Sequence, residues 1–163
     1  MSHNLIDVVI LRHGEADNAT PDNARSLTER GRSQVASQCK WLREQGFSPE
    51  MILHSPYQRT TETAEIAKTV FSDDSPSDSL LELQVEPLIT PDGNPAMVSE
   101  LIPVLEKRRI LLASHMPMVS YLTATLLPDG DLFGYPVAGL CWIQLCLDEP
   151  QKTRLLHKHW PSN

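Results

Sequence analysis

The residues of this sequence that are best suited to chemistry are two histidines and two arginines, each placed at or shortly after the end of an apolar run. They are Arg12, His13, Arg59 and His115. A neutral histidine can attack phosphorus, and a cationic histidine can stabilise charge on phosphate oxygens. The planar guanidinium of arginine can contact two such oxygens at once, which would fill the electrostatic role of a metal ion. Brought into one pocket, these four side chains would suit phosphoryl transfer.

These residues are predicted to lie at the carboxyl ends of three strands. The apolar runs predicted to form buried strands are Asp7–Leu11, Met51–His54 and Arg109–Ser114. In an open α/β sheet, ligands bind beyond the carboxyl ends of the strands. Because helical side chains lean towards the helix N-terminus, Arg59 should reach back over this edge. The helices that follow Ser55 and His115 would add free backbone N–H groups.

Helices are predicted to alternate with these strands. The expected helices run from a cap at Thr28 to a stop near Gly46, from Ser55 and Pro56 to about Phe71, over Ala96–Lys107 with a kink or early end at Pro103, and over Met116–Leu127. The other expected segments are an exposed flexible loop over Ser72–Ser79, a short strand or irregular segment in Leu80–Leu88, and two final strands over Gly139–Leu147 and Thr153–Trp160. This order predicts an α/β fold whose mostly parallel sheet is covered on both faces and has an antiparallel edge.

Length, charge and cysteine usage narrow the class of protein. The 163 residues suffice for one domain with a full core, so a single domain over 1–163 is expected. The net charge of −7 disfavours nucleic-acid binding, which requires a basic face. We find neither an apolar run of membrane-span length nor a secretory signal in Met1–Asp7, so a cytoplasmic location without membrane contact is expected. Three cysteines without a C-x-x-C pair are typical of a reducing compartment.

Four segments together resemble the histidine phosphatase superfamily, also called phosphoglycerate mutase-like. They are "LRHGEA", "SLTERGRSQ", "SPYQRTTETA" and "LLASHMPMVSYL". The resemblance implies a three-layer α/β/α sandwich and a phosphatase that needs no metal or other cofactor. It also implies that His13 is phosphorylated during turnover. The residues expected to bind the substrate beside His13 are Arg12, Gly14, Arg59, His115 and Met116.

Within this superfamily the chain is most similar to the SixA-type phosphohistidine phosphatases. It shares their minimal length, the "TPDGNP" segment and "SHMPMVSYL". No cap domain is apparent in Ser72–Asn94, where Glu82, Glu86 and Asp92 are the candidates for a general acid. Histidine titrates near pH ~6.5, so a leaving imidazole needs far less help from an acid than an alkoxide does. The expected substrate is therefore a histidine-phosphorylated phosphotransfer protein in signal transduction, and the enzyme is expected to be a monomer.

Two other functions remain open at this stage. A small-molecule phosphomonoesterase of the same superfamily would use one of the three acids as its proton donor. A non-catalytic phospho-binding module would need no nucleophile, although both histidines and both arginines are present. A separate pair, His157 and His159, shares a face of the last predicted strand and could in principle bind zinc. Without a third ligand nearby, a half-exposed edge strand is the simpler interpretation of that pair.

Overall fold

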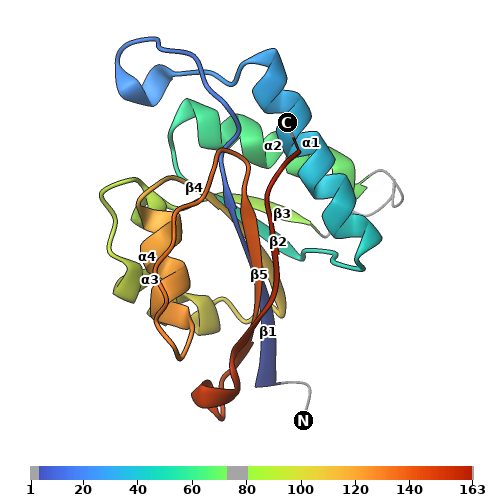
Figure 1. The fold of residues 1–163 in the computed structure, drawn as a ribbon, viewed down its shortest axis with the longest axis vertical. Coiled ribbons are helices and arrows are strands. Elements are labelled where there is room, and N and C mark those ends of the chain that lie inside the picture. The colour runs from blue at the N-terminus through green and yellow to red at the C-terminus, as the bar shows by residue number, and fades with distance from the viewer. Residues whose placement is uncertain (1–3, 73–80, 163) are drawn as a thin grey trace.

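Residues 4–72 and 81–162 are described by the computed structural model, in which six strands form one sheet (Figure 1). The strands are β1 (Leu5–Arg12), β2 (Met51–His54), β3 (Glu82–Val85), β4 (Arg109–Ser114), β5 (Leu140–Cys146) and β6 (Arg154–His159), in the spatial order β3-β2-β4-β1-β5-β6. The first four in that order are parallel to one another, whereas β5 is antiparallel to β1 and β6 is antiparallel to β5. The predicted sheet, mostly parallel with an antiparallel edge, is confirmed.

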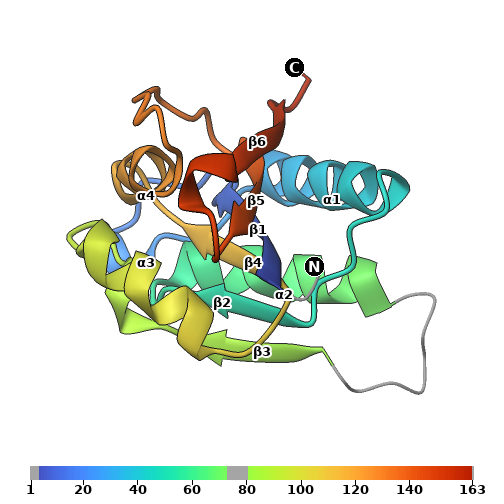
Figure 2. The same cartoon turned by 90° about the horizontal axis from the view of Figure 1, so that it is seen from below.

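Helices cover both faces of the sheet in the described part of the chain (Figure 2). One face is covered by α1 (Glu29–Glu44) and α2 (Gln58–Ser72), and the other by α3 (Pro95–Val104) and α4 (Met118–Leu126). Two hydrophobic clusters, one on each face, join these helices to the strands between them. The arrangement is the three-layer α/β/α sandwich. Among the described helices, none has the length and apolar character that crossing a membrane requires.

The central strand β1 shows why its sequence is continuously apolar. Val8 and Ile10 pack into the cluster under α3 and α4, whereas Val9 and Leu11 pack into the cluster under α1 and α2. All four side chains are fully buried. Burying each of these side chains contributes roughly 1.5–3 kcal/mol relative to exposure. A polar residue on either face of β1 would therefore be costly. The buried apolar run ends at Leu11, so the polar residues Arg12 and His13 come at the carboxyl end of the strand.

Strand register brings three strand ends to one level. Arg12 of β1 pairs with Ser114 of β4, and Ala113 of β4 pairs with His54 of β2. The ladder continues one step further, because the backbone N–H of His13 donates to the carbonyl of Ser114 at 3.0 Å. Residues that directly follow these strands therefore start from adjacent points of one sheet edge.

The loop after β1 crosses the first turn of α1 at two glycines. Thr28 caps this helix, as predicted, by accepting a hydrogen bond from the N–H of Gly31. A Cβ at Gly31 would overlap the carbonyl oxygen of Glu15, and a Cβ at Gly14 would lie 2.5 Å from the carbonyl oxygen of Gly31. Both residues must therefore be glycine for the loop and the helix to approach this closely.

Two helix starts differ from the predictions by more than one residue. Helix α2 begins at Gln58 rather than at Ser55, although the Ser55 hydroxyl does accept the N–H of Tyr57 at 3.3 Å. Helix α3 ends at Val104, directly after Pro103, which is the early end that this proline predicted. Helix α4 begins at Met118 rather than at Met116. Of the predicted loop 72–79, residue 72 ends α2 and residues 73–79 lie outside the described residues.

The Gly31→Ala variant is expected to lose about 3 kcal/mol of folding free energy. In an ordinary helix this change adds roughly 1 kcal/mol of stability, but here the new methyl group overlaps the Glu15 backbone. Urea denaturation measures the difference. Ser37→Ala, at an exposed position of the same helix, is the matched control and should be neutral or slightly stabilising. A Gly31→Ala protein as stable as the wild type would contradict the close crossing.

Candidate active site

The carboxyl edge of the parallel strands gathers the four side chains that the sequence singles out. Arg12 ends β1 and His13 follows it, Arg59 is the second residue of α2, and His115 follows β4. The ring centroids of His13 and His115 are 5.4 Å apart. The Nε of Arg59 lies 3.2 Å from Nε2 of His13. Arg12 acts electrostatically on both imidazole rings. Four residues from three distant parts of the chain thus form one cationic pocket.

The hydrogen bonds of His13 define which nitrogen can react. Its Nδ1 lies 2.7 Å from the carbonyl oxygen of Gly14. A carbonyl can only accept, so Nδ1 carries the proton and Nε2 carries the lone pair. Arg59 donates its Nε–H to that lone pair at 3.2 Å. Nε2 is therefore the nitrogen of His13 whose lone pair could act as a nucleophile.

His115 is held by a pair of hydroxyl groups. Its Nε2 lies 2.7 Å from the Oγ of Ser55, which in turn lies 2.5 Å from the Oγ1 of Thr60. The Ser55 hydroxyl also accepts the backbone N–H of Tyr57 at 3.3 Å, so it contacts the turn before α2 as well as His115. The Nδ1 of His115 is buried without a hydrogen-bond partner among the described residues. When Ser55 donates to Nε2, Nδ1 carries the ring proton and can donate it to an anion.

Arg12 is anchored on one side and unpaired on another. Its Nη1 donates to the carbonyl oxygen of Tyr135 at 2.6 Å, which fixes the plane of the guanidinium. Its Nε is buried and, within the described part of the chain, has no hydrogen-bond partner. Leaving a buried donor unpaired costs roughly 1–3 kcal/mol. Nε of Arg12 and Nδ1 of His115 are therefore two donors that the oxygens of a bound anion can satisfy.

Burial and positive charge keep both histidines unprotonated. Burial, against the opposing effect of the hydrogen bond to the Gly14 carbonyl and together with the nearby Arg59 and Arg12, lowers the pKa of His13 to about 4. Burial also lowers the pKa of His115 to about 3, together with His13 and Arg59. With only the protein's own groups around it, His115 is neutral at pH 7. The cationic role considered for the second histidine requires a bound anion that raises its pKa.

The loop between β1 and α1 contributes two residues that the sequence analysis missed. Asp22 accepts hydrogen bonds from Arg59 through its backbone oxygen at 2.8 Å and its carboxylate at 3.2 Å. Arg25 bonds the same carboxylate at 3.2 Å and adds to the positive field that acts on Arg12 and His13. The hydrogen bond from Arg25 lowers the pKa of Asp22. No local pattern marked this loop, since its contacts reach 37 residues along the chain to α2.

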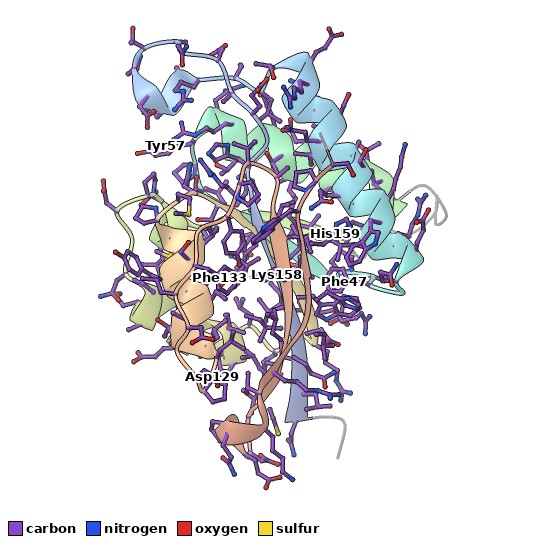
Figure 3. The ribbon with its side chains drawn as sticks, in the orientation of Figure 1. Phe47, Tyr57, Asp129, Phe133, Lys158 and His159 are labelled. Carbon is purple, nitrogen blue, oxygen red and sulfur yellow. The ribbon has the colours of Figure 1, made fainter. Side chains whose placement is uncertain are left out.

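Tyr57 is a further residue that sequence reasoning missed. Its ring packs edge-on against His115 with centroids 4.8 Å apart, and the guanidinium carbon of Arg59 lies 5.0 Å from its centroid. Figure 3 labels Tyr57 beyond the strand ends. The aromatic ring shields one side of the pocket while it contacts two of the pocket's side chains. The one sequence signal for it is its position between Ser55 and Arg59.

The two other predicted substrate contacts are Gly14 and Met116, which directly follow His13 and His115 in the chain. Each of them also has a structural role. The glycine is required by the crossing with Gly31, and its N–H donates to Thr63 at 3.3 Å. The sulfur of Met116 accepts a hydrogen bond from Ser120 at 3.0 Å, and the side chain is partly buried. Whether either touches substrate stays a prediction.

The three candidate acids are not equivalent in position. Glu82 begins β3, so it lies at the opposite edge of the sheet from the pocket, where it pairs with Lys107 at 2.8 Å. Glu86 lies at the correct edge, but its carboxylate accepts the N–H of Leu88 at 2.8 Å and caps a short 3₁₀ turn. Asp92 is exposed in the turn before α3. The geometry therefore removes Glu82 from the pocket and leaves Asp92 as the candidate without a capping role.

His157 and His159 pack on tryptophan rings. The ring of His159 stacks on Trp41 at 3.8 Å between centroids, and His157 contacts Trp41 at 5.3 Å. His159 also bonds the side chain of Gln38 through Nδ1 at 2.8 Å. Within residues 4–72 and 81–162 no group of three His, Cys, Asp or Glu side chains is arranged to hold a metal ion. The two histidines therefore pack the edge strand β6 against α1.

His13 and His115 are expected to titrate near pH 4 and pH 3, respectively, in NMR spectra of the folded protein. Tungstate should raise both values, because a bound anion stabilises the protonated rings. Unfolded histidine titrates near pH ~6.5, so the unfolded chain binds these protons first and stability is lost as the pH falls from about 6.5 to about 3. Urea denaturation across this range should give a shallower dependence for His13→Asn. Titration of both rings near ~6.5 in the folded protein would contradict the buried, cationic pocket.

Comparisons with known proteins agree with this geometry. A family model of the histidine phosphatase superfamily (branch 1) matches residues 8–85. Phosphohistidine phosphatase SixA of Escherichia coli (strain K12) is 33% identical over 127 residues, which cover 76% of this chain and 75% of that protein. A solved structure of the protein histidine phosphatase SixA complexed with tungstate has a TM-score of 0.84 at 28% identity and covers 96% of this chain and 97% of its own. The phosphoglycerate mutase-like fold is thereby confirmed, and the chain belongs to the histidine phosphatase superfamily.

Proposed function

We propose that this protein is a phosphohistidine phosphatase that removes the phosphoryl group from a histidine of a partner protein. The observation that carries the proposal is the neutral His13, whose Nε2 lone pair faces Arg59 inside a cationic pocket. The similarity to the phosphohistidine phosphatase SixA supports the same activity. The pocket also contains two unpaired buried donors, on Arg12 and His115, that a tetrahedral oxyanion can occupy.

Substrate binding uses charge and unpaired donors together. The phosphoryl oxygens take the place of the Arg59–His13 hydrogen bond and accept from Nε of Arg12 and Nδ1 of His115. A doubly negative group between the buried guanidinium of Arg59 and the partly buried one of Arg12 gains more Coulomb energy than it would in water, because the local dielectric is lower. It also raises the pKa of His115, and a proton taken up at Nε2 would make the hydrogen bond from Nδ1 to the phosphoryl group charge-assisted.

In the first chemical step, Nε2 of His13 attacks the phosphorus. A bond forms between Nε2 and phosphorus while the bond between phosphorus and the substrate's imidazole nitrogen breaks. The electron pair of the broken bond stays on that nitrogen, which takes a proton from solvent. Nδ1 of His13 keeps its hydrogen bond to the Gly14 carbonyl, so the ring holds its orientation during transfer. The arginines stabilise the charge that spreads over the phosphoryl oxygens.

In the second step, water hydrolyses the phosphorylated His13. The water oxygen bonds to phosphorus, the bond to Nε2 breaks, and its electron pair restores the lone pair on Nε2. The water releases a proton to solvent, which balances the proton taken up in the first step. Inorganic phosphate leaves, and Arg59 returns to its hydrogen bond with the ring.

The leaving group favours phosphohistidine over an alkyl phosphate. An alkoxide must be protonated as it leaves, whereas imidazole accepts a proton readily near pH ~6.5. Of the three acids considered, Glu82 is at the far edge of the sheet, Glu86 caps a turn, and Asp92 is exposed in the turn before α3. A substrate that needs no strong acid is therefore the better match to this pocket.

The His13→Ala variant is expected to lose turnover of phosphohistidine and the trapped phosphate label on the enzyme. His115→Ala should still become labelled but turn over about 10²-fold to 10³-fold more slowly, since it loses one donor to the phosphoryl oxygens. Acid-quenched labelling with ³²P and steady-state rates measure both effects. The matched control is His54→Ala, at a buried histidine whose Nδ1 bonds the Ser55 backbone oxygen. Normal turnover by His13→Ala would refute the covalent route, and a strong preference for alkyl phosphates would refute the substrate class.

The Asp22→Asn variant is expected to bind inorganic phosphate about threefold more tightly than the wild type. The Asp22 carboxylate lies 3.2 Å from Arg59 and offsets part of the charge that attracts the anion, although solvent and salt screen this exposed group. Calorimetric titration at low and high ionic strength measures the effect, which should shrink with salt. Asp129→Asn removes the same charge from an exposed loop and is the control. Unchanged or weaker phosphate binding by Asp22→Asn would exclude competition between Asp22 and the substrate.

A further inference from the structure

An apolar groove of about 300 Å³ opens next to the phosphate pocket. Its lining includes Met116, Pro117, Tyr121, Leu132, Phe133 and Gly134. The start of α4 forms one wall, and the loop between α4 and β5 forms the other. Tyr121 is 49% exposed and Leu132 is 60% exposed, which are high values for large apolar side chains. Exposed apolar side chains around a concave surface are typical of a protein interaction site.

The first wall is continuous with the catalytic pocket along the chain. Met116 directly follows His115, so the backbone that positions the second histidine also enters the groove. The hydroxyl of Ser120 donates to the sulfur of Met116 at 3.0 Å and holds this side chain against α4. A molecule that contacts Met116 is therefore one residue away from the ring that faces the phosphoryl group.

The second wall is continuous with the pocket through Tyr135. Phe133 stacks on the Tyr135 ring with centroids 5.9 Å apart, and the Tyr135 hydroxyl lies 2.6 Å from Thr123 of α4. The backbone oxygen of Tyr135 accepts the hydrogen bond that orients Arg12. Lys158 covers the Phe133 ring from β6 at 4.2 Å, which leaves Leu132 as the exposed part of this wall. In Figure 3, Phe133 and Lys158 are labelled close together, and Tyr57 lies beyond them towards the strand ends.

The depth of the pocket requires contact at its rim. His13 is 5% exposed and His115 is 1% exposed, so a phosphohistidine must insert its side chain to reach Nε2. The surface around that phosphohistidine then lies against the rim of the pocket. Contacts to the phosphoryl group are the same for every phosphohistidine, so they cannot distinguish one protein from another. Selectivity for a protein must come from neighbouring contacts.

We propose that the groove docks an apolar side chain that lies beside the phosphohistidine on the surface of the partner protein. The inference rests on the proposed function, because it takes a phosphohistidine in the pocket as the fixed point. The volume of the groove is at the low end for ligand sites and suits one or two apolar side chains. Tyr121 and Leu132 supply the exposed apolar surface that such a side chain buries.

The test compares a protein substrate with the free amino acid. The probes are a purified histidine phosphotransfer domain, phosphorylated with phosphoramidate, and free phosphohistidine. Leu132→Ser and Tyr121→Ser are expected to lower kcat/KM for the phosphorylated domain about tenfold, mainly through KM, because loss of one central apolar contact costs more than 1 kcal/mol. Turnover of free phosphohistidine, which has no neighbouring side chain to place in the groove, should be unchanged. Val104→Ser, at a 73% exposed apolar residue that ends α3, is the matched control and should leave both substrates unaffected.

The outcomes separate the docking surface from the catalytic proposal. If wild-type protein turns over neither probe, the proposed function fails, and the docking surface fails with it. If both probes are turned over and the groove variants keep the wild-type ratio, the docking surface alone is overturned. An equal loss of kcat/KM for both probes would show that Leu132 and Tyr121 maintain the structure of the catalytic pocket, and it would also overturn the docking surface. Sedimentation that shows a wild-type dimer and a Leu132→Ser monomer would assign the groove to a second copy of this chain.

Discussion

The contact between Nε2 of His13 and the guanidinium of Arg59 sets the conditions for the rest of the pocket. Burial disfavours a protonated His13 ring, and the positive charges of Arg59 and Arg12 disfavour it further, so the pKa of the ring is lowered and the ring is neutral. Neutrality leaves a lone pair for attack on phosphorus. When a phosphoryl dianion enters, its charge offsets the same two guanidiniums, and protonation of His115 becomes favourable. In the proposed mechanism, the same two guanidiniums therefore keep His13 neutral before the substrate binds and stabilise the phosphoryl group during its transfer.

The backbone of His13 is fixed on several sides by elements that meet only in the folded protein. Its N–H continues the ladder to β4, and its carbonyl accepts the N–H of Ala138 at 2.8 Å. Ala138 has a φ of 58°, a strained conformation for a residue with a Cβ. The side chain of Gln38 on α1 donates to the carbonyl of Ala138 at 2.9 Å and to that of His159 at 2.8 Å. Helix α1 and the last strand thus help to hold the loop that supports the nucleophile.

What the sequence predicted well depends on local patterns, and what it missed depends on contacts across the chain. Met51–His54 and Arg109–Ser114 were predicted with their observed bounds, because two-sided burial leaves an uninterrupted apolar run. The start of α2 was placed too early, because serine before proline has the pattern of a helix cap. The Ser55 hydroxyl does accept the N–H of Tyr57, but it also bonds His115, and the helix itself begins at Gln58. Asp22 and Arg25 lie in a polar loop without periodicity, and their link to α2 appears only in three dimensions.

The choice of leaving group follows from where the carboxylates lie. Parallel strands place their ends at opposite edges, so Glu82 at the start of β3 is separated from the pocket by the length of the strand. Glu86 follows β3 directly, but its carboxylate is bonded to the N–H of Leu88, and Asp92 is exposed in the turn before α3. The hydrogen bond from Arg25 lowers the pKa of the Asp22 carboxyl beside Arg59, and the other titratable groups of the pocket are guanidiniums and two imidazoles of lowered pKa, so none of these groups is a proton donor at neutral pH. Such a site gains most by breaking a phosphorus–nitrogen bond, whose departing imidazole can draw its proton from water.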